Sequence, residues 1–209
     1  MHEDIEFFIK KFNVSRETIE KLNKYKNFLL ISNKLLNLIG KTTENRIFSR
    51  HFIDSAQIYD LIEDKSEIVD IGSGAGFPGV IIKILMNNNK IEGNVTLIEK
   101  SPKKCNFLEE LSKELGLVLK IINLRVENFK LNKISTIVSR AFKNTVDTID
   151  ILIKNNDKIR NIILIKGKTY QQELEDAKKK YTFDLEKFRS ITSDESYILK
   201  ITNIKRGTT

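Results

Sequence analysis

The sequence contains few of the residues that build disulfide-held or metal-held structures. Its 209 residues include one cysteine, Cys105, and two histidines. A single cysteine cannot form an internal disulfide, and this set is a poor source of ligands for a structural zinc ion, so we expect chemistry without a metal. No stretch approaches the roughly 18 consecutive apolar residues that a membrane-spanning helix needs.

The chain also lacks signals that would divide it or export it. Its first residues, MHEDIEFFIKKF, carry acidic side chains at amphipathic spacing instead of a basic and apolar leader, so we expect a cytoplasmic protein. We find no internal repeat, low-complexity tract or linker. The length suits one α/β unit with a modest addition, which we place as a helical extension over residues 1–62 packed on a core domain over residues 63–209.

Positive charge is in excess, with a formal net charge of +8. The excess lies in residues 100–209, which carry 23 basic and 14 acidic side chains. Lysines on one face neutralise nucleic-acid phosphates and release counterions, so a basic face for RNA is one interpretation. A solvated lysine surface is the other.

The stretch EIVDIGSGAGFPG, residues 67–79, has the pattern of a strand, a glycine turn and the start of a helix. Four of the nine glycines lie here, where the backbone can take a positive φ or admit a close neighbour. Pro78 suits the first turn of the helix that follows. We therefore expect a ligand against the turn, with contacts from Asp70, Gly72, Gly74 and Gly76.

The identity of that ligand depends on Glu99, which closes the next apolar run. A carboxylate at this position accepts hydrogen bonds from both hydroxyls of a ribose. NAD and S-adenosylmethionine both carry one, but NAD also needs a helix N-terminus for its diphosphate, whereas a sulfonium cation prefers nearby carboxylates such as Asp70. The residues favour S-adenosylmethionine, with NAD as the alternative. Val126 and Glu127 follow the third strand and are placed to meet the adenine.

The rest of the pattern alternates strands and helices, which indicates a doubly wound sheet. We expect further strands at 95–99, 117–122, 134–138 and 161–165, and helices at 3–12, 15–31, 80–86, 101–116, 145–155 and 173–180. Residues 33–42 read as a helix that runs into a polar loop. The tail, at 182–185 and 196–204, suits an antiparallel hairpin.

A polar cluster precedes the first strand, within a helix that we expect to begin at Arg50. Arg50, His51, Asp54 and Ser55 stand about one turn apart, so they share a face. A structural histidine is one interpretation, and a wall of the cofactor or substrate pocket is the other.

Ser139 and Arg140 follow the fourth strand, at the edge where a methyltransferase of this topology holds its acceptor. The chain has no Asn/Asp-Pro-Pro-aromatic turn for an exocyclic base nitrogen, and Cys105 lies in the wrong element to attack a pyrimidine carbon. A ring nitrogen with its own lone pair, such as guanine N7, requires neither device. It requires positioning and an in-line sulfonium.

Seven motifs occur in the order in which one family carries them: NKLLNL, RHFIDS, EIVDIGSGAGFPGV, SPKK, RVEN, SRAF and ILIKGK. The chain thus resembles, over nearly its whole length, the RsmG (GidB) family of bacterial 16S rRNA guanine-N7 methyltransferases. The resemblance implies a Rossmann-like class I methyltransferase fold with a seven-stranded, mainly parallel sheet. It also implies S-adenosylmethionine as cofactor, with contacts from Gly72, Phe77, Val126, Glu127 and Arg140.

The resemblance implies methyl transfer to N7 of one guanine in the decoding-region loop, guanine 527 in the usual rRNA numbering. The partner would be 16S rRNA or the small ribosomal subunit, and we expect a monomer. Arg140, beside Ser139, would orient cofactor and base, while Arg50, His51, Lys166 and Lys168 hold RNA or line the pocket. An NAD-binding oxidoreductase and a non-catalytic RNA-binding module are the rival interpretations.

Overall fold

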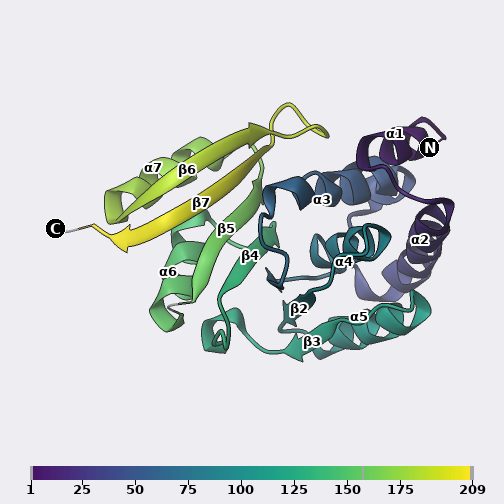
Figure 1. The fold of residues 1–209 in the computed structure, drawn as a ribbon, viewed down its shortest axis with the longest axis horizontal. Coiled ribbons are helices and arrows are strands. Elements are labelled where there is room, and N and C mark those ends of the chain that lie inside the picture. The colour runs from purple at the N-terminus through teal and green to yellow at the C-terminus, as the bar shows by residue number, and fades with distance from the viewer. Residues whose placement is uncertain (1, 157, 208–209) are drawn as a thin grey trace.

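A seven-stranded sheet forms the centre of the protein in the computed structural model, which describes residues 2–156 and 158–207 (Figure 1). Its strand order is β3-β2-β1-β4-β5-β7-β6. The first five strands are parallel, and β7 runs antiparallel to both β5 and β6. The strands are β1 Glu67–Ile71, β2 Asn94–Glu99, β3 Lys120–Asn123, β4 Ser135–Arg140, β5 Ile159–Lys166, β6 Tyr181–Arg189 and β7 Tyr197–Arg206. The expected sheet and its C-terminal hairpin are confirmed.

Helices cover both faces of the sheet, and each face has its own apolar core. The crossover helices are α4 Gly79–Asn88, α5 Pro102–Glu114, α6 Thr145–Asn155 and α7 Tyr170–Lys180. Successive strand residues point to opposite faces, so Val138 joins the core that contains α4 and α5 whereas Ile137 joins the core that contains α6 and α7. This burial on both faces explains why the parallel strands read as continuous apolar runs.

The N-terminal segment lies on the α4 and α5 side of the sheet (Figure 1). Its elements are α1 His2–Phe12, α2 Arg16–Leu36, the 3₁₀ turn η1 Lys41–Arg46, the π-helical η2 Phe48–Ile53, the short α3 Asp54–Ala56 and the 3₁₀ turn η3 Tyr59–Leu61. Ser15 caps α2, because its side chain accepts a hydrogen bond from the Thr18 backbone. Phe8 and Tyr25 are buried in the same core as Leu108 of α5.

Two expectations for this segment were wrong. Separate helices were expected at 15–31 and from residue 33, but α2 runs without a break from Arg16 to Leu36. The buried amide of Asn33 donates to the Ile39 carbonyl and accepts the Ile39 N–H. The helix expected from Arg50 onward is instead a π-helical turn followed by short α and 3₁₀ pieces.

Strand β4 extends further than its apolar pattern suggested. Ser139 and Arg140 were expected beyond its end, but they pair with Leu164 and Ile165 of β5. Pairing with a neighbouring strand decides this boundary, and no local residue type announces it.

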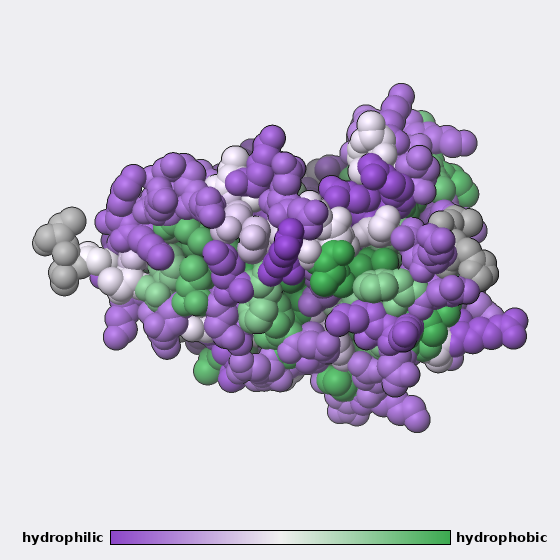
Figure 2. Space-filling view, turned by 90° about the horizontal axis from the view of Figure 1, so that it is seen from above, coloured by the Kyte–Doolittle hydropathy of each residue, from purple (hydrophilic) through white to green (hydrophobic). Residues whose placement is uncertain are grey.

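The face shown in Figure 2 is mostly hydrophilic, with apolar residues in small separate groups. Among the described residues, no helix has both the length and the apolarity to cross a membrane.

Candidate active site

The glycine turn connects the end of β1 to α4 and bonds mainly to itself and to β2. The N–H groups of Gly72 and Ser73 both donate to the Ile98 carbonyl, at 2.9 and 3.1 Å. Those of Gly76 and Phe77 donate to the Ser73 carbonyl, at 2.7 and 3.1 Å. These four N–H groups are therefore bonded to β2 or within the turn, and they are not free to hold a diphosphate in the way that a nest of N–H groups does.

Asp70 lies behind the turn and not on its open side. Its side chain is fully buried, and Oδ2 accepts the N–H of Gly79, the first residue of α4, at 2.9 Å. Burial raises the pKa of Asp70 to about 7, and the hydrogen bond from Gly79 opposes that rise without cancelling it. Asp70 was expected to contact the cofactor. In the structure its side chain bonds the first N–H of α4, and Asp70 is not among the residues that line the two cavities described next.

A cavity of about 270 Å³ opens on the other side of the turn, at the carboxyl ends of β2, β3 and β4. We call it the glycine-turn cavity. It brings together four of the expected cofactor residues from separate parts of the chain, and its lining is Gly72, Ile98, Glu99, Lys100, Lys104, Leu124, Arg125, Val126, Glu127, Ala141, Phe142 and Lys143. Open α/β sheets bind ligands at this edge, where the strand order reverses.

Glu99 is the buried carboxylate of this cavity, with 7% of its surface exposed. Oε2 accepts the N–H of Gly74 at 3.0 Å, and Oε1 accepts the N–H of Ser101 at 2.8 Å. These two bonds fix the carboxylate plane and leave each oxygen with further acceptor capacity. Glu99 can therefore accept hydrogen bonds from a ligand with paired hydroxyls.

Gly72 and Val126 form apolar walls of the glycine-turn cavity. Gly72 has φ +70°, and a Cβ at this position would lie 2.6 Å from Cδ2 of Phe142, so only glycine fits. Val126 is buried. Glu127 stands at the mouth and pairs with Lys143 at 3.4 Å.

A second cavity, of about 610 Å³, adjoins the first, and we call it the arginine cavity. The two share Ala141, Phe142 and Lys143, which follow directly on β4. The remaining lining residues are Leu38, Ile39, Gly40, Thr43, Arg50, His51, Asp54, Arg140, Asn144, Ile165, Lys166, Gly167, Glu173 and Ser196. The two cavities are therefore neighbours at the 141–143 segment.

Arg140 makes three hydrogen bonds and lies against one aromatic ring. Its Nη1 donates to the Arg50 carbonyl at 3.1 Å and to Oδ2 of Asp54 at 3.2 Å, and its guanidinium carbon lies 4.7 Å from the centre of the Phe77 ring. Nη2 donates to Nδ1 of His51 at 3.0 Å. The guanidinium has five N–H donors, so two remain for a ligand in the arginine cavity.

His51 is a neutral member of this cluster. Because Nδ1 accepts from Arg140, Nε2 carries the proton and donates to Oγ1 of Thr43 at 2.9 Å. Burial first, and then the charges of Arg140 and Arg50, lower the pKa of His51 to about 3. The ring stacks on Phe77, with centres 5.2 Å apart. Its observed role is to orient Arg140.

Several expected site residues are buried away from the cavities. Ser139 donates to the Ile71 carbonyl at 3.0 Å, and Ser55 is fully buried with no hydrogen-bond partner for Oγ among the described residues. Ser55 was expected on one face with Asp54, but the chain turns by roughly 100° per residue there, which directs it into the core. Gly76 and Phe77 pack against Tyr25, which lies on the core side of the turn.

The two expected lysines differ from each other. Lys166 lines the arginine cavity, but it is 8% exposed and pairs with Glu173 at 2.9 Å. Lys168 is exposed and lies outside the lining. Of these two, only Lys168 presents an exposed side chain to a phosphate.

The sequence analysis missed part of both linings. Lys100, Leu124 and Ala141 follow the ends of β2, β3 and β4, so the rule that places ligands at carboxyl ends of strands could have found them. Leu38, Ile39 and Gly40 could not be found in this way, because they follow a helix and no strand. The Asn33 side chain bonds the backbone of Ile39 and holds this loop in place.

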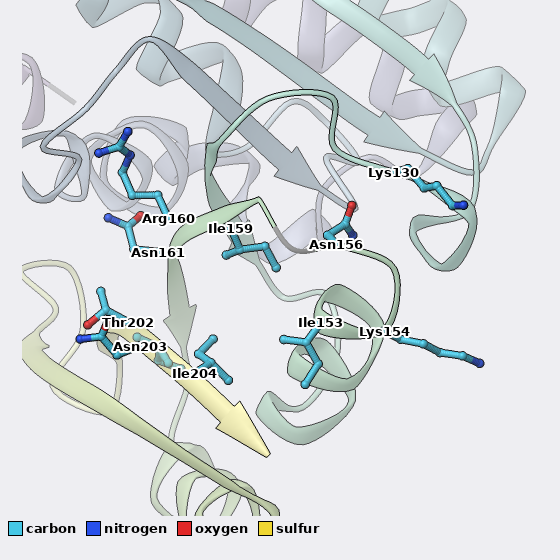
Figure 3. Close-up of a pocket in the computed structure, with 11 residues that line it drawn as sticks. Lys130, Ile153, Lys154, Asn156, Ile159, Arg160, Asn161, Thr202, Asn203 and Ile204 are labelled. Atoms are coloured by element: carbon cyan, nitrogen blue, oxygen red, sulfur yellow. The ribbon is translucent and has the colours of Figure 1, made fainter. Parts of the chain in front are cut away.

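A further cavity, of about 640 Å³, lies at the opposite edge of the sheet, where β5 begins and β7 ends. In Figure 3, Arg160 and Asn161 lie on one side of it, while Lys130 and Lys154 extend away on the other. None of the expected site residues lines it. It is separate from the two cavities at the carboxyl edge.

Comparisons with known proteins identify the family of the chain. The sequence model of one family, described as rRNA small subunit methyltransferase G, matches residues 18–200. The chain is 37% identical over 201 residues to the Ribosomal RNA small subunit methyltransferase G of Pelagibacter ubique, covering 95% of this chain and 94% of that one. It is 38% identical over 194 residues to the protein of the same name from Rickettsia akari, covering 92% and 98%.

Solved structures share the fold at low sequence identity. A ribosomal protein methylase from Lactobacillus delbrueckii subsp. bulgaricus has a TM-score of 0.56 at 15% identity, over 81% of each chain. TrmK from M. capricolum, solved with S-adenosyl-homocysteine, has a TM-score of 0.52 at 20% identity, over 71% of this chain and 66% of that one. The expected class I methyltransferase fold is confirmed.

Proposed function

Because the chain belongs to the rRNA small subunit methyltransferase G family, we propose that it transfers the methyl group of S-adenosylmethionine to N7 of one guanine of 16S rRNA. The glycine-turn cavity holds the cofactor in this proposal, and the arginine cavity holds the base. The expected position is the decoding-region guanine that the family resemblance implies.

One observation favours an adenosyl cofactor over a dinucleotide. In dinucleotide enzymes the diphosphate rests on the N-terminus of the helix that follows the glycine turn. Here the first N–H of α4 is bonded to the Asp70 carboxyl group, and the N–H groups of Gly72, Ser73, Gly74, Gly76 and Phe77 are bonded to Ile98, Glu99 and Ser73. These donors are not available to a diphosphate, whereas Glu99 retains acceptor capacity for ribose hydroxyls.

The same cavity offers the other contacts that S-adenosylmethionine requires. Val126 supplies an apolar wall for the adenine, and Gly72 admits the cofactor next to the Phe142 ring. The bound cofactor supplies an electrophilic methyl group on a sulfonium. The protein's part is to hold that methyl group towards the shared 141–143 segment and to exclude water from it.

The arginine cavity suits an acceptor that needs positioning and no deprotonation. Guanine N7 carries its own lone pair, so a neutral His51 that cannot act as a base at physiological pH is no obstacle. The two remaining donors of Arg140 can bond the O6 acceptor of the guanine. The base must be unstacked from the RNA to enter, as enzymes that act on bases require.

The test is methyl transfer from radiolabelled S-adenosylmethionine to small-subunit rRNA and to particles from a strain that lacks this gene. We expect label in N7-methylguanine at a single position. Label elsewhere, or no label from a protein that calorimetry shows to bind the cofactor, would refute the acceptor. Tight binding of NAD without binding of S-adenosylmethionine would instead support the oxidoreductase, and RNA binding without label would support the non-catalytic module.

A matched pair of variants tests the cofactor site. Glu99→Gln removes the charge that accepts the ribose hydroxyls, so the dissociation constant for S-adenosylmethionine should rise about 10- to 100-fold by calorimetry. Glu92→Gln changes an exposed residue before β2 and should bind like the wild type. Equal affinity in all three proteins would remove Glu99 from the cofactor site.

The proposal includes a cytoplasmic monomer that acts on rRNA or on an assembling small subunit. Sedimentation of the purified protein, alone and with particles, tests the monomer. A stable dimer at micromolar concentration would contradict it.

A further inference from the structure

The tip of the β6–β7 hairpin reaches across the molecule to the cluster around Arg140. We infer that Thr192, in this tip, is a positioning residue that sets the orientation of Arg140 through Asp54. The inference deepens the proposed function and rests on it for its kinetic consequence.

Asp54 connects the tip to Arg140 through its two carboxylate oxygens. Oδ1 accepts the hydroxyl of Thr192 at 2.7 Å and the amide of Gln57 at 3.0 Å. Oδ2 accepts Nη1 of Arg140 at 3.2 Å. Thr192 of the hairpin thus bonds one oxygen of the Asp54 carboxylate, and Arg140 bonds the other.

The tip is anchored at several further points, so its contact with Asp54 has a defined geometry. The Ile191 N–H donates to Oε1 of Gln57 at 2.9 Å, and Nε2 of Gln57 donates to the Ser190 hydroxyl at 3.1 Å. The Thr192 N–H donates to the same hydroxyl at 3.2 Å. Nη1 of Arg50 also reaches the Thr192 carbonyl, at 3.4 Å.

The arrangement matters because the ion pair is largely removed from water. The side chains of Arg140 and Asp54 are 17% and 13% exposed. A carboxylate in such a place needs each oxygen satisfied, and loss of one partner allows it to rotate towards another. Arg140 would then lose the orientation that its bonds to Arg50, Asp54 and His51 give it at the wall of the arginine cavity. Thr192 would act on the reaction without lining either cavity.

The experiment compares three hairpin variants in single-turnover methyl transfer. Thr192→Val keeps the shape but removes the hydroxyl, so the rate should fall about tenfold while the dissociation constant for S-adenosylmethionine stays within twofold of wild type. Thr192→Ser restores the hydroxyl and should recover most of the rate. Thr182→Val, at an exposed threonine of β6, is the matched control and should behave like wild type.

A double-mutant cycle distinguishes positioning of Arg140 from a general structural effect. In an Arg140→Lys background, Thr192→Val should reduce the remaining rate less than twofold, because the group that Thr192 acts on is gone. A tenfold loss in both backgrounds would overturn the inference. Equal loss of rate for Thr192→Ser and Thr192→Val would overturn it as well.

A second readout does not depend on methyl transfer. The ¹⁵N NMR signal of the Arg140 side-chain Nε–H, assigned with Arg140→Lys, should shift in Thr192→Val and stay unchanged in Thr182→Val. An unchanged signal in Thr192→Val refutes the positioning role whatever the enzyme does. A shifted signal in Thr192→Val, together with a wild-type protein that methylates no rRNA, would leave the positioning role standing and refute the proposed function.

Discussion

Replacement of Asp70 by asparagine should make the protein more stable at neutral and alkaline pH. Asp70 is fully buried, and its pKa is raised from 3.8 to about 7. The folded protein therefore binds a proton more tightly than the unfolded chain, and stability falls as the pH rises from about 4 to about 7. Asparagine still accepts the Gly79 N–H and carries no charge, so Asp70→Asn lacks this loss.

The size of the effect follows from the two pKa values. Between pH 5 and pH 8 the free energy of unfolding of the wild type should fall relative to that of Asp70→Asn by about 2–3 kcal/mol. Urea unfolding followed by circular dichroism measures it, as a relative change in midpoint of about 1 M. The titration of His51 affects both proteins alike and cancels in the comparison.

Two outcomes would refute the reasoning about Asp70. One is a stability difference between the two proteins that does not change between pH 5 and pH 8. The other is a difference of the opposite sign, with the wild type gaining on the variant as the pH rises. Asp60→Asn, at an exposed position before β1, is the control. It keeps Asp70, so its stability should change between pH 5 and pH 8 as that of the wild type does.

Two further predictions concern the walls of the site. The imidazole NMR signals of His51, assigned with His51→Gln, should show no titration midpoint above pH 5, since the pKa of His51 is lowered to about 3. Because the unfolded chain binds the proton more readily than the folded protein, stability is lost as the pH falls from about 6.5 towards 3. A titration midpoint near 6.5 would contradict this prediction. Gly72→Ala should unfold about 1–3 kcal/mol more easily and bind S-adenosylmethionine more weakly, because its Cβ meets Phe142 in addition to the cost of φ +70°. Gly116→Ala has φ +59° with no atom within 4 Å, so it measures the backbone cost alone, and equal losses in the two variants would exclude the Phe142 contact.

The architecture and the sheet edge at which the two adjoining cavities lie could be predicted from local sequence. Alternation of apolar runs with helical periods fixes a parallel sheet, and the carboxyl ends of its strands fix the edge where ligands bind. Glu99 and Val126 were identified in this way, because Glu99 is the last residue of β2 and Val126 lies shortly after the end of β3. Both line the glycine-turn cavity.

The direction of individual side chains could not be predicted, because it depends on contacts between distant segments. Asp70 reads as a cofactor ligand in the sequence, yet it turns inward to the start of α4. Ser139 reads as a loop residue, yet pairing with β5 keeps it inside the sheet. A strand residue faces one side or the other according to register, and the sequence does not state the register.

The amino-acid sequence by itself determined the fold class, the glycine turn and the carboxylate at the end of the second strand, since each depends on residues close together in the chain. Only the tertiary structure decided that Arg140 meets His51, Asp54 and, through Asp54, Thr192. Thr192 and Asp54, for example, are 138 positions apart, and no local propensity specifies such a meeting. Packing of the N-terminal segment and the hairpin tip onto the sheet edge brings them together, and burial there lowers the pKa of His51.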